Sequence, residues 1–350
     1  MPSMQVLIDG TVPTGSGLSS SAAMVVSSLI SSLLSTSTSI SLPKQQIVRL
    51  AMVSERNVGV NSGGMDQAAS VFGQKDKAVF VEFAPELKGT TVKFPDDNVA
   101  FVIANSGVNA DKHDTAPENY NLRVVETTLA AEILAKELGL GELKSRDGFG
   151  GTLQEVVQKY FEGKGLKEDE KLENFQKVVD DVFKEDGEYT RSELADMMGM
   201  KESDLVEKYM TRFEGMILRS QDLIVVRTEK FKLLKRTRHV LSEARRVYLF
   251  RNLLSKNPKD LYKELGQLMN ASQTSCRDDF QCSCPELDQL CEIARKSGAY
   301  GARLTGTVSP FFMLKSRGGL GWCDSCFDDQ RGCGWHHRWT NWGVLQGQVS

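Results

Sequence analysis

The segment TVPTGSGLSSSAA at residues 11–23 combines the residue types that bind a phosphate group. Two glycines flank a serine, three more serines follow, and an apolar segment of helical length then begins. Glycines let the backbone approach a phosphate closely, the first N–H groups of a helix lack partners, and serine hydroxyls can bind phosphate oxygens or Mg²⁺. The pattern differs from the P-loop because no lysine follows, and from G-x-G-x-x-G because Ser20 occupies the third glycine position. On these grounds alone, a phosphate-binding loop and a simple capped turn are equally supported.

Two carboxylates downstream of this segment are candidates for chemistry. Asp66 follows the turn GVNSGGM, and Glu55 lies eleven residues earlier, near the end of an expected helix. A carboxylate beside a hydroxyl can accept its proton while the oxygen attacks a γ-phosphorus. Considered alone, however, Asp66 fits a turn or a helix cap better, and Glu55 fits an exposed helical position.

Apolar periodicity and turn signals predict the elements that would position these groups. We expect a strand at residues 4–8, a buried helix over 19–35, a helix that begins at Pro43, and strands at 78–83, 91–94 and 99–105. From about residue 121 the pattern becomes helical. Further helices are expected within 119–138, 147–163, 164–190, 264–276 and 285–298, and another begins at a capping box formed by Thr190 and Glu193.

The composition is ordinary for a soluble globular protein of about two domains. The 350 residues are 40% hydrophobic and 25% charged, with a net charge of −3, which argues against a nucleic-acid-binding surface. No apolar run approaches the ~20 residues of a membrane span, and the N-terminus lacks the layout of a secretory signal. Seven unevenly spaced cysteines do not indicate a disulfide framework, so we expect a cytoplasmic protein.

Several longer motifs resemble those of the GHMP small-molecule kinases and, within them, of galactokinases, particularly fungal ones. These motifs are PTGSGLSSSAA, ERNVGVNSGGMDQAAS, TAPENYNLRVVE, LMNASQTSCRDDFQCSCPELDQL and GAYGARLTG. The resemblance covers roughly residues 5–306 and implies the α+β, two-domain GHMP kinase fold. It places a partial N-terminal domain of ribosomal-S5-like architecture at residues 1–125. An incomplete ferredoxin-like C-terminal domain with helical insertions would occupy residues 126–306.

The same resemblance implies an ATP-dependent kinase that phosphorylates galactose at its anomeric hydroxyl, with Asp66 as the general base. Its cofactors would be ATP and Mg²⁺, and the implied Mg²⁺ ligands are Ser19 and Glu55. Lys112 fits an exposed loop lysine at least as well as a nucleotide contact. The implied phosphate and nucleotide contacts are Gly15, Ser16, Gly17, Leu18, Ser19, Ser20, Ser21 and Lys112. The implied sugar contacts are Ser62, Gly63, Asp66 and Tyr120, whose ring suits a pyranose face.

Two alternative functions remain open at this stage. One is a galactose- and ATP-binding transcriptional co-inducer, which would bind a repressor protein, and the other is an N-acetylgalactosamine kinase. Galactokinase-like sensors lack a serine–alanine pair of the serine run, whereas SSSAA is intact here, which favours the enzyme. We expect a monomer whose partners are galactose and ATP, without nucleic acid or membrane.

Two family signatures have no counterpart in the chain. The N-terminal GRVNLIGEH-x-DY signature, which supplies sugar contacts and an arginine beside the catalytic aspartate, is not present, and TVSPFFMLKSRGG stands where AG-x-GGC is expected after Gly306. We therefore expect a galactokinase truncated at its N-terminus. Residues 307–350 would be an unrelated, disordered tail or the product of a shifted frame or an unspliced intron. Such a chain, expressed alone, is expected to be poorly soluble or inactive.

The remaining histidines and cysteines give weaker signals. His113 and His239 lack partners that would suggest a triad or a metal site, and Cys282 and Cys284 are expected to serve in packing. The C-terminal segment contains ligand types suited to zinc, but their spacing fits no zinc-finger pattern well. These residues are Cys323, Cys326, Cys333, His336 and His337.

Overall fold

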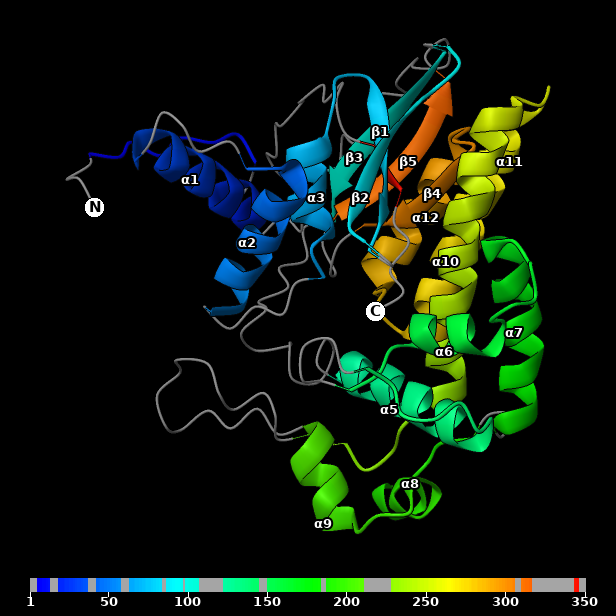
Figure 1. Ribbon diagram of the computed structural model, residues 1–350. Helices are drawn as coiled ribbons and strands as arrows, with labels where there is room; N and C mark the ends of the chain where they lie inside the picture. The colour runs from blue at the N-terminus through cyan, green and yellow to red at the C-terminus, as the bar shows by residue number, and fades with distance from the viewer. Residues whose placement is uncertain are drawn as a thin grey trace.

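The computed structural model describes most of the chain between residues 5 and 345. The described ranges are 5–12, 18–36, 42–57, 63–83, 86–96, 98–106, 122–144, 150–183, 187–210, 228–305, 310–316 and 343–345. Within these ranges, helices and two small sheets together form an α+β fold (Figure 1).

Three helices at the N-terminal side pack against one another. They are α1(Ser20–Thr36), α2(Lys44–Asn57) and α3(Met65–Phe72). Helices α1 and α2 were predicted in outline, whereas α3 was not predicted as a helix, and α1 is not the buried helix that its apolar composition suggested. Only Ala22 and Val26 are buried on it, while Met24 and Leu34 are exposed, because the described residues packed against α1 come mainly from α2 and α3.

The strand predicted at residues 4–8 is wrong for the part that the structure describes. Residues 5–10 have no regular secondary structure, and Val6, Leu7 and Ile8 are exposed, with Leu7 at 95%. A strand requires a neighbour that satisfies its backbone N–H and C=O groups. No described strand pairs with this segment.

The described strands form two three-stranded sheets, which lie between α3 on one side and α10(Leu233–Lys256) and α11(Leu261–Ser275) on the other (Figure 1). In the first, β1(Lys77–Glu82) lies between an antiparallel β2(Lys88–Lys93) and a parallel β6(Gly343–Leu345). In the second, β5(Pro310–Ser316) lies between β3(Val99–Asn105) and β4(Gly301–Leu304), antiparallel to both. The predictions for β1, β2 and β3 are confirmed to within a few residues.

Strand β5 differs from what the sequence suggested for residues 307–350. The segment was expected to be either a disordered tail or the product of a shifted frame or an unspliced intron, and residues 310–316 form the central strand of the second sheet, with the Leu314 side chain fully buried. β6 comes from the same part of the chain. The backbone N–H and C=O groups of β5 pair with those of β3 and β4. Because β3 lies about 200 residues earlier in the chain, the local sequence around β5 does not indicate this pairing.

A helical body lies between β3 and β4 in the sequence. It contains α5(Leu122–Glu137), α6(Leu153–Tyr160), α7(Glu168–Val182), α8(Arg191–Met198), α9(Glu202–Leu205), the π-turn η2(Val206–Met210) and α10(Leu233–Lys256). The Thr190 capping box is confirmed, because its side chain accepts a bond from the Glu193 N–H while Glu193 accepts from the Thr190 N–H. Helix α10 had no counterpart among the predicted elements.

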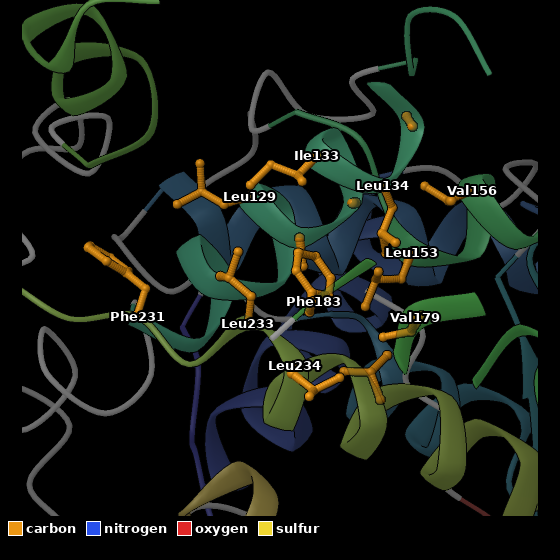
Figure 2. Packing of buried hydrophobic residues seen from close by; sticks show 14 of the residues in the cluster. Leu129, Ile133, Leu134, Leu153, Val156, Val179, Phe183, Phe231, Leu233 and Leu234 are labelled. Atoms are coloured by element: carbon orange, nitrogen blue, oxygen red, sulfur yellow. The ribbon is translucent and has the colours of Figure 1, made fainter. Parts of the chain in front are cut away.

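The apolar side chains of α5, α6, α7 and α10 form the largest core of the described structure. Figure 2 shows Phe183 between α5 and α10, with Leu129, Leu134, Leu153 and Leu234 around it. A second core joins this body to the sheets. Phe80 of β1 and Leu314 of β5 belong to it, together with apolar residues of α10 and of α11(Leu261–Ser275).

A buried ion-pair network centred on Glu126 joins α5 to α10. Glu126 accepts from Arg236 Nε at 2.7 Å and from Arg123 Nη1 at 3.0 Å, and its other oxygen accepts from the Lys232 N–H at 2.9 Å. Both arginines also bond to the end of the π-turn η4(Cys276–Phe280), at the carbonyls of Asp279 and Phe280. The next helix, α12(Pro285–Lys296), packs on β4.

Candidate functional site

The first turn of α1 begins at a residue in an unusual backbone conformation. Ser19 precedes α1 and has a φ of +56°, in the left-handed region that residues other than glycine rarely adopt. Its carbonyl accepts the Ala23 N–H at 3.1 Å, so Ser19 is the N-cap of the helix. Such outliers are retained where the surrounding structure imposes them, often at functional sites.

The first turn of α3 carries Asp66 and depends on a glycine. Gly64 is the N-cap residue, with a φ of +85°, and a Cβ placed on it would lie 2.3 Å from Met52 Sδ of α2. A side chain at residue 64 would therefore be strained by the positive φ and would require the Met52 side chain to move. Gly64 thus lets α3, and hence Asp66, begin close to α2.

A direct hydrogen bond joins these two helix starts. Ser19 Oγ donates to Asp66 Oδ2 at 2.5 Å, across 47 residues of sequence. A hydroxyl has one donor hydrogen and two acceptor lone pairs, so this bond leaves the Ser19 oxygen able to bind a cation. The bond fixes the carboxylate of Asp66 beside the N-terminal end of α1, which is the positive end of the helix dipole.

Glu55 lies in the interior, contrary to the exposed position that its residue type suggested. It is 3% exposed and continues the face of α2 formed by the buried Val48 and Ala51 and the half-buried Met52, at spacings of three and four residues. Gln67 Nε2 of α3 donates to Glu55 Oε2, and Gln67 itself is fully buried. The sequence reading missed Gln67, since nothing in the local pattern places it against α2.

The donors at this site suit a magnesium ion. Glu55 Oε1 is a buried carboxylate oxygen for which the described part of the chain provides no hydrogen-bond partner. Buried carboxylate oxygens are costly unless paired with a donor or a cation. Mg²⁺ prefers few hard oxygen ligands from the protein, completed by phosphate and water, and Glu55 with Ser19 fits that requirement. Among the described residues, no group of three or more His, Cys, Asp or Glu side chains could hold a metal.

The other predicted contacts are divided between described and undescribed residues. Ser20 and Ser21 are the first two residues of α1, Leu18 is half-buried just before Ser19, and Gly63 is exposed just before Gly64. The remaining predicted contacts lie outside the described residues. They are Gly15, Ser16, Gly17, Ser62, Lys112 and Tyr120.

The weaker candidates behave as structural residues where they are described. His239 is buried in α10, where its Nδ1 lies 3.0 Å from Ser275 Oγ and its ring stacks on Phe280. Burial lowers the pKa of His239 to about 4, partly opposed by the nearby Glu243. Cys282 and Cys284 pack against the small core formed by η4, α12 and β4. His113 and the candidate zinc ligands lie outside the described residues.

No helix in the described part of the chain is both long and apolar enough to cross a membrane.

Two segments of the chain match known protein families, one near its N-terminus and one towards its C-terminal side. Residues 2–74 match the GHMP kinases N terminal domain, and residues 254–307 match the GHMP kinases C terminal family. The first segment contains Ser19, Glu55 and Asp66, whereas the predicted contacts Lys112 and Tyr120 lie beyond it.

Curated relatives are galactokinases. The galactokinases of Saccharomyces cerevisiae and Candida parapsilosis are each 37% identical, over 326 and 315 residues, and that of Schizosaccharomyces pombe is 35% identical over 324 residues. Each match covers 87% of this chain and 60% of the relative, so the chain spans about 60% of the length of these proteins.

A solved structure shares the fold. The crystal structure of Lactococcus lactis galactokinase complexed with galactose superposes with a TM-score of 0.56 and 22% sequence identity, covering 89% of this chain and 61% of that one.

Proposed function

Because this chain matches the GHMP kinase N- and C-terminal families and resembles galactokinases over 87% of its length, we propose that it acts as a galactokinase, transferring the γ-phosphoryl group of ATP to the anomeric hydroxyl of galactose. The observation that carries the proposal is the hydrogen bond from Ser19 Oγ to Asp66 Oδ2. It joins the start of the helix that follows the phosphate loop to the carboxylate of the galactokinase-like motif, so that one site contains both an anion-binding helix end and a proton acceptor.

In this proposal Asp66 is the general base. A carboxylate can accept about four hydrogen bonds, so the single bond from Ser19 leaves Asp66 able to accept the proton of the sugar hydroxyl. The unpaired N–H groups in the first turn of α1 would bind the phosphate oxygens of ATP. These N–H groups belong to residues that directly follow Ser19, and the Ser19 hydroxyl bonds to Asp66. The segment around Ser19 would therefore contact both the nucleotide and the base.

Glu55 and Ser19 would hold Mg²⁺, through Glu55 Oε1 and the hydroxyl oxygen of Ser19. When bound, Mg²⁺ neutralises charge on the β- and γ-phosphate oxygens during transfer. The proposed galactose contacts are Gly63, which precedes α3 by two residues, and Ser62 and Tyr120. Placing galactose there would bring its hydroxyl to the side of Asp66.

Nucleotide binding is the first test, since it needs no turnover. We expect the chain to bind Mg·ATP in a titration with a fluorescent ATP analogue. Glu55→Gln is expected to weaken that binding at least tenfold, because the metal loses an anionic ligand, whereas Asp66→Asn should change it little. A chain that folds but binds no Mg·ATP would overturn the nucleotide site.

Phosphoryl transfer is the second test. We expect ADP release that depends on galactose, and a loss of roughly 10²–10⁴-fold in Asp66→Asn, the range for removing a general base. Asp181→Asn, an exposed carboxylate on α7, serves as the matched control and should retain full activity. The expectation of an inactive chain and this proposal give opposite results here, so the assay decides between them. Equal rates in Asp66→Asn and the control would refute Asp66 as the base.

A further inference from the structure

We infer that Gln67 is a positioning residue for Glu55: its amide holds one carboxylate oxygen so that the other remains available to a divalent cation. The inference rests on the proposed function, because it concerns the same metal site. Gln67 Nε2 donates to Glu55 Oε2, while Oε1 has no hydrogen-bond partner among the described residues. The two oxygens of one carboxylate are therefore in different environments.

Both side chains are buried, so their hydrogen bond is shielded from solvent and the two side chains have little freedom to move apart. Glu55 is 3% exposed and Gln67 is fully buried, at the junction where α2 packs on α3. A buried carboxylate is strongly disfavoured without a donor or a counter-charge. Gln67 supplies one donor, and the second oxygen is left to be satisfied by a cation.

The neutrality of the amide matters as much as its hydrogen bond. An arginine or lysine at residue 67 would also donate to Glu55, but its positive charge would repel a divalent cation at the same carboxylate. An amide donates without charge, so the full negative charge of Glu55 remains available to the metal. Groups that orient a metal ligand in this way typically change metal affinity by 10–100-fold when removed.

The position of Gln67 in α3 couples the two halves of the site. Gln67 directly follows Asp66, and consecutive side chains of a helix project about 100° apart. Asp66 consequently reaches Ser19 at the start of α1, while Gln67 reaches Glu55 on α2. One helical turn, set in place by Gly64, therefore orients both the proposed base and the proposed metal ligand.

The test separates metal affinity from fold stability. Binding of Mn²⁺ in the presence of a non-hydrolysable ATP analogue is measured by electron paramagnetic resonance, and thermal unfolding is measured on the same samples without metal. Gln67→Met keeps the volume but removes the donor, and we expect it to weaken Mn²⁺ binding by about 10–100-fold. Gln67→Asn keeps an amide that is too short to reach Glu55. It should act in the same direction, and it provides a second variant if Gln67→Met does not fold.

A matched control comes from a second buried glutamine that donates to a carboxylate. Gln273 Nε2 bonds to Asp288 Oδ1 at 2.8 Å, between α11 and α12. Gln273→Met should lower the unfolding temperature but leave Mn²⁺ affinity unchanged. If Gln67→Met behaves in the same way, Gln67 is only structural and the inference is wrong.

An exchange of the two residues gives the sharper result. The double variant Glu55→Gln/Gln67→Glu restores an amide-to-carboxylate bond in the same place, but moves the charge from α2 to α3. We expect it to recover the unfolding temperature relative to Gln67→Met without recovering Mn²⁺ affinity. Recovery of both would overturn the inference. Failure of the unsubstituted protein to bind Mn²⁺ with the nucleotide would instead overturn the proposed function, and with it the metal site.

Discussion

Removing the charge of Glu126 is expected to cost a large part of the stability of the protein. Glu126 is 1% exposed and accepts three hydrogen bonds, two of them from the guanidinium groups of Arg236 and Arg123. Arg236 is itself 2% exposed. In Glu126→Gln the side chain keeps its shape, but two buried cations lose their shared counter-ion.

The magnitude follows from the burial of the network. Breaking a buried pair by removing one partner typically costs about 3–5 kcal/mol, because an uncompensated charge stays in the interior. The folded states of proteins are only about 5–15 kcal/mol more stable than the unfolded ones, so Glu126→Gln should lose roughly a fifth or more of this difference. Lys232 limits the loss, because its N–H can still bond to the carbonyl oxygen of the new amide.

The assay is equilibrium unfolding in urea, with the midpoint compared at an unchanged slope. Glu173→Gln is the matched control, because Glu173 is about half-exposed where it pairs with Arg245 at 2.8 Å. An exposed pair of this kind contributes about 0–1 kcal/mol. If Glu126→Gln cost no more than Glu173→Gln, the reasoning about the buried charges would be refuted.

Two further predictions concern the same helical body and its junction with the second sheet. Because burial lowers the pKa of His239 to about 4 from an ordinary value near 6.5, the unfolded chain binds its proton first as the pH falls. The free energy of unfolding should therefore drop by about 2–3 kcal/mol between pH 6.5 and 4.5, and His239→Gln should remove most of that slope in urea unfolding. A Cβ on Gly266 would lie 2.2 Å from the Tyr300 carbonyl oxygen, so Gly266→Ala should cost about 1–3 kcal/mol or more. Gly10→Ala, which meets nothing within 4 Å, should change stability by less than about 0.5 kcal/mol, and equal effects of the two substitutions would contradict the close approach.

Much of the secondary structure could be predicted because its signals are local. The strand predicted at residues 99–105 is β3, and the Thr190 capping box begins α8 as expected. Helix α10 was missed for a physical reason. Its buried face includes Arg236, His239 and Glu243, whose polar groups contact partners distant in sequence, so the apolar stripe that identifies a helix is interrupted.

The candidate site shows the same division between local and long-range information. Ser19, Glu55 and Asp66 could be named from motifs, but their depth and contacts could not. Glu55 lies at the apolar spacing of α2, but its hydrogen-bond partner comes from α3, and Gln67 meets it only where these two helices pack. The spacing within one helix can indicate that Glu55 faces the interior, but it does not identify the residue of another helix that Glu55 contacts.

The order of strands in the second sheet has a consequence for how the chain is made. β5 is the central strand of its sheet, yet the ribosome completes it after β3, β4 and every helix that the structure describes. Val99 of β3 pairs with Ser316 of β5, so this pair can form only after the more than 200 residues between them have been synthesised. Until then β3 and β4 lack their shared neighbour and present open backbone edges. We expect the helical body to condense first and the second sheet to close last, with the nascent chain depending on chaperones during that interval.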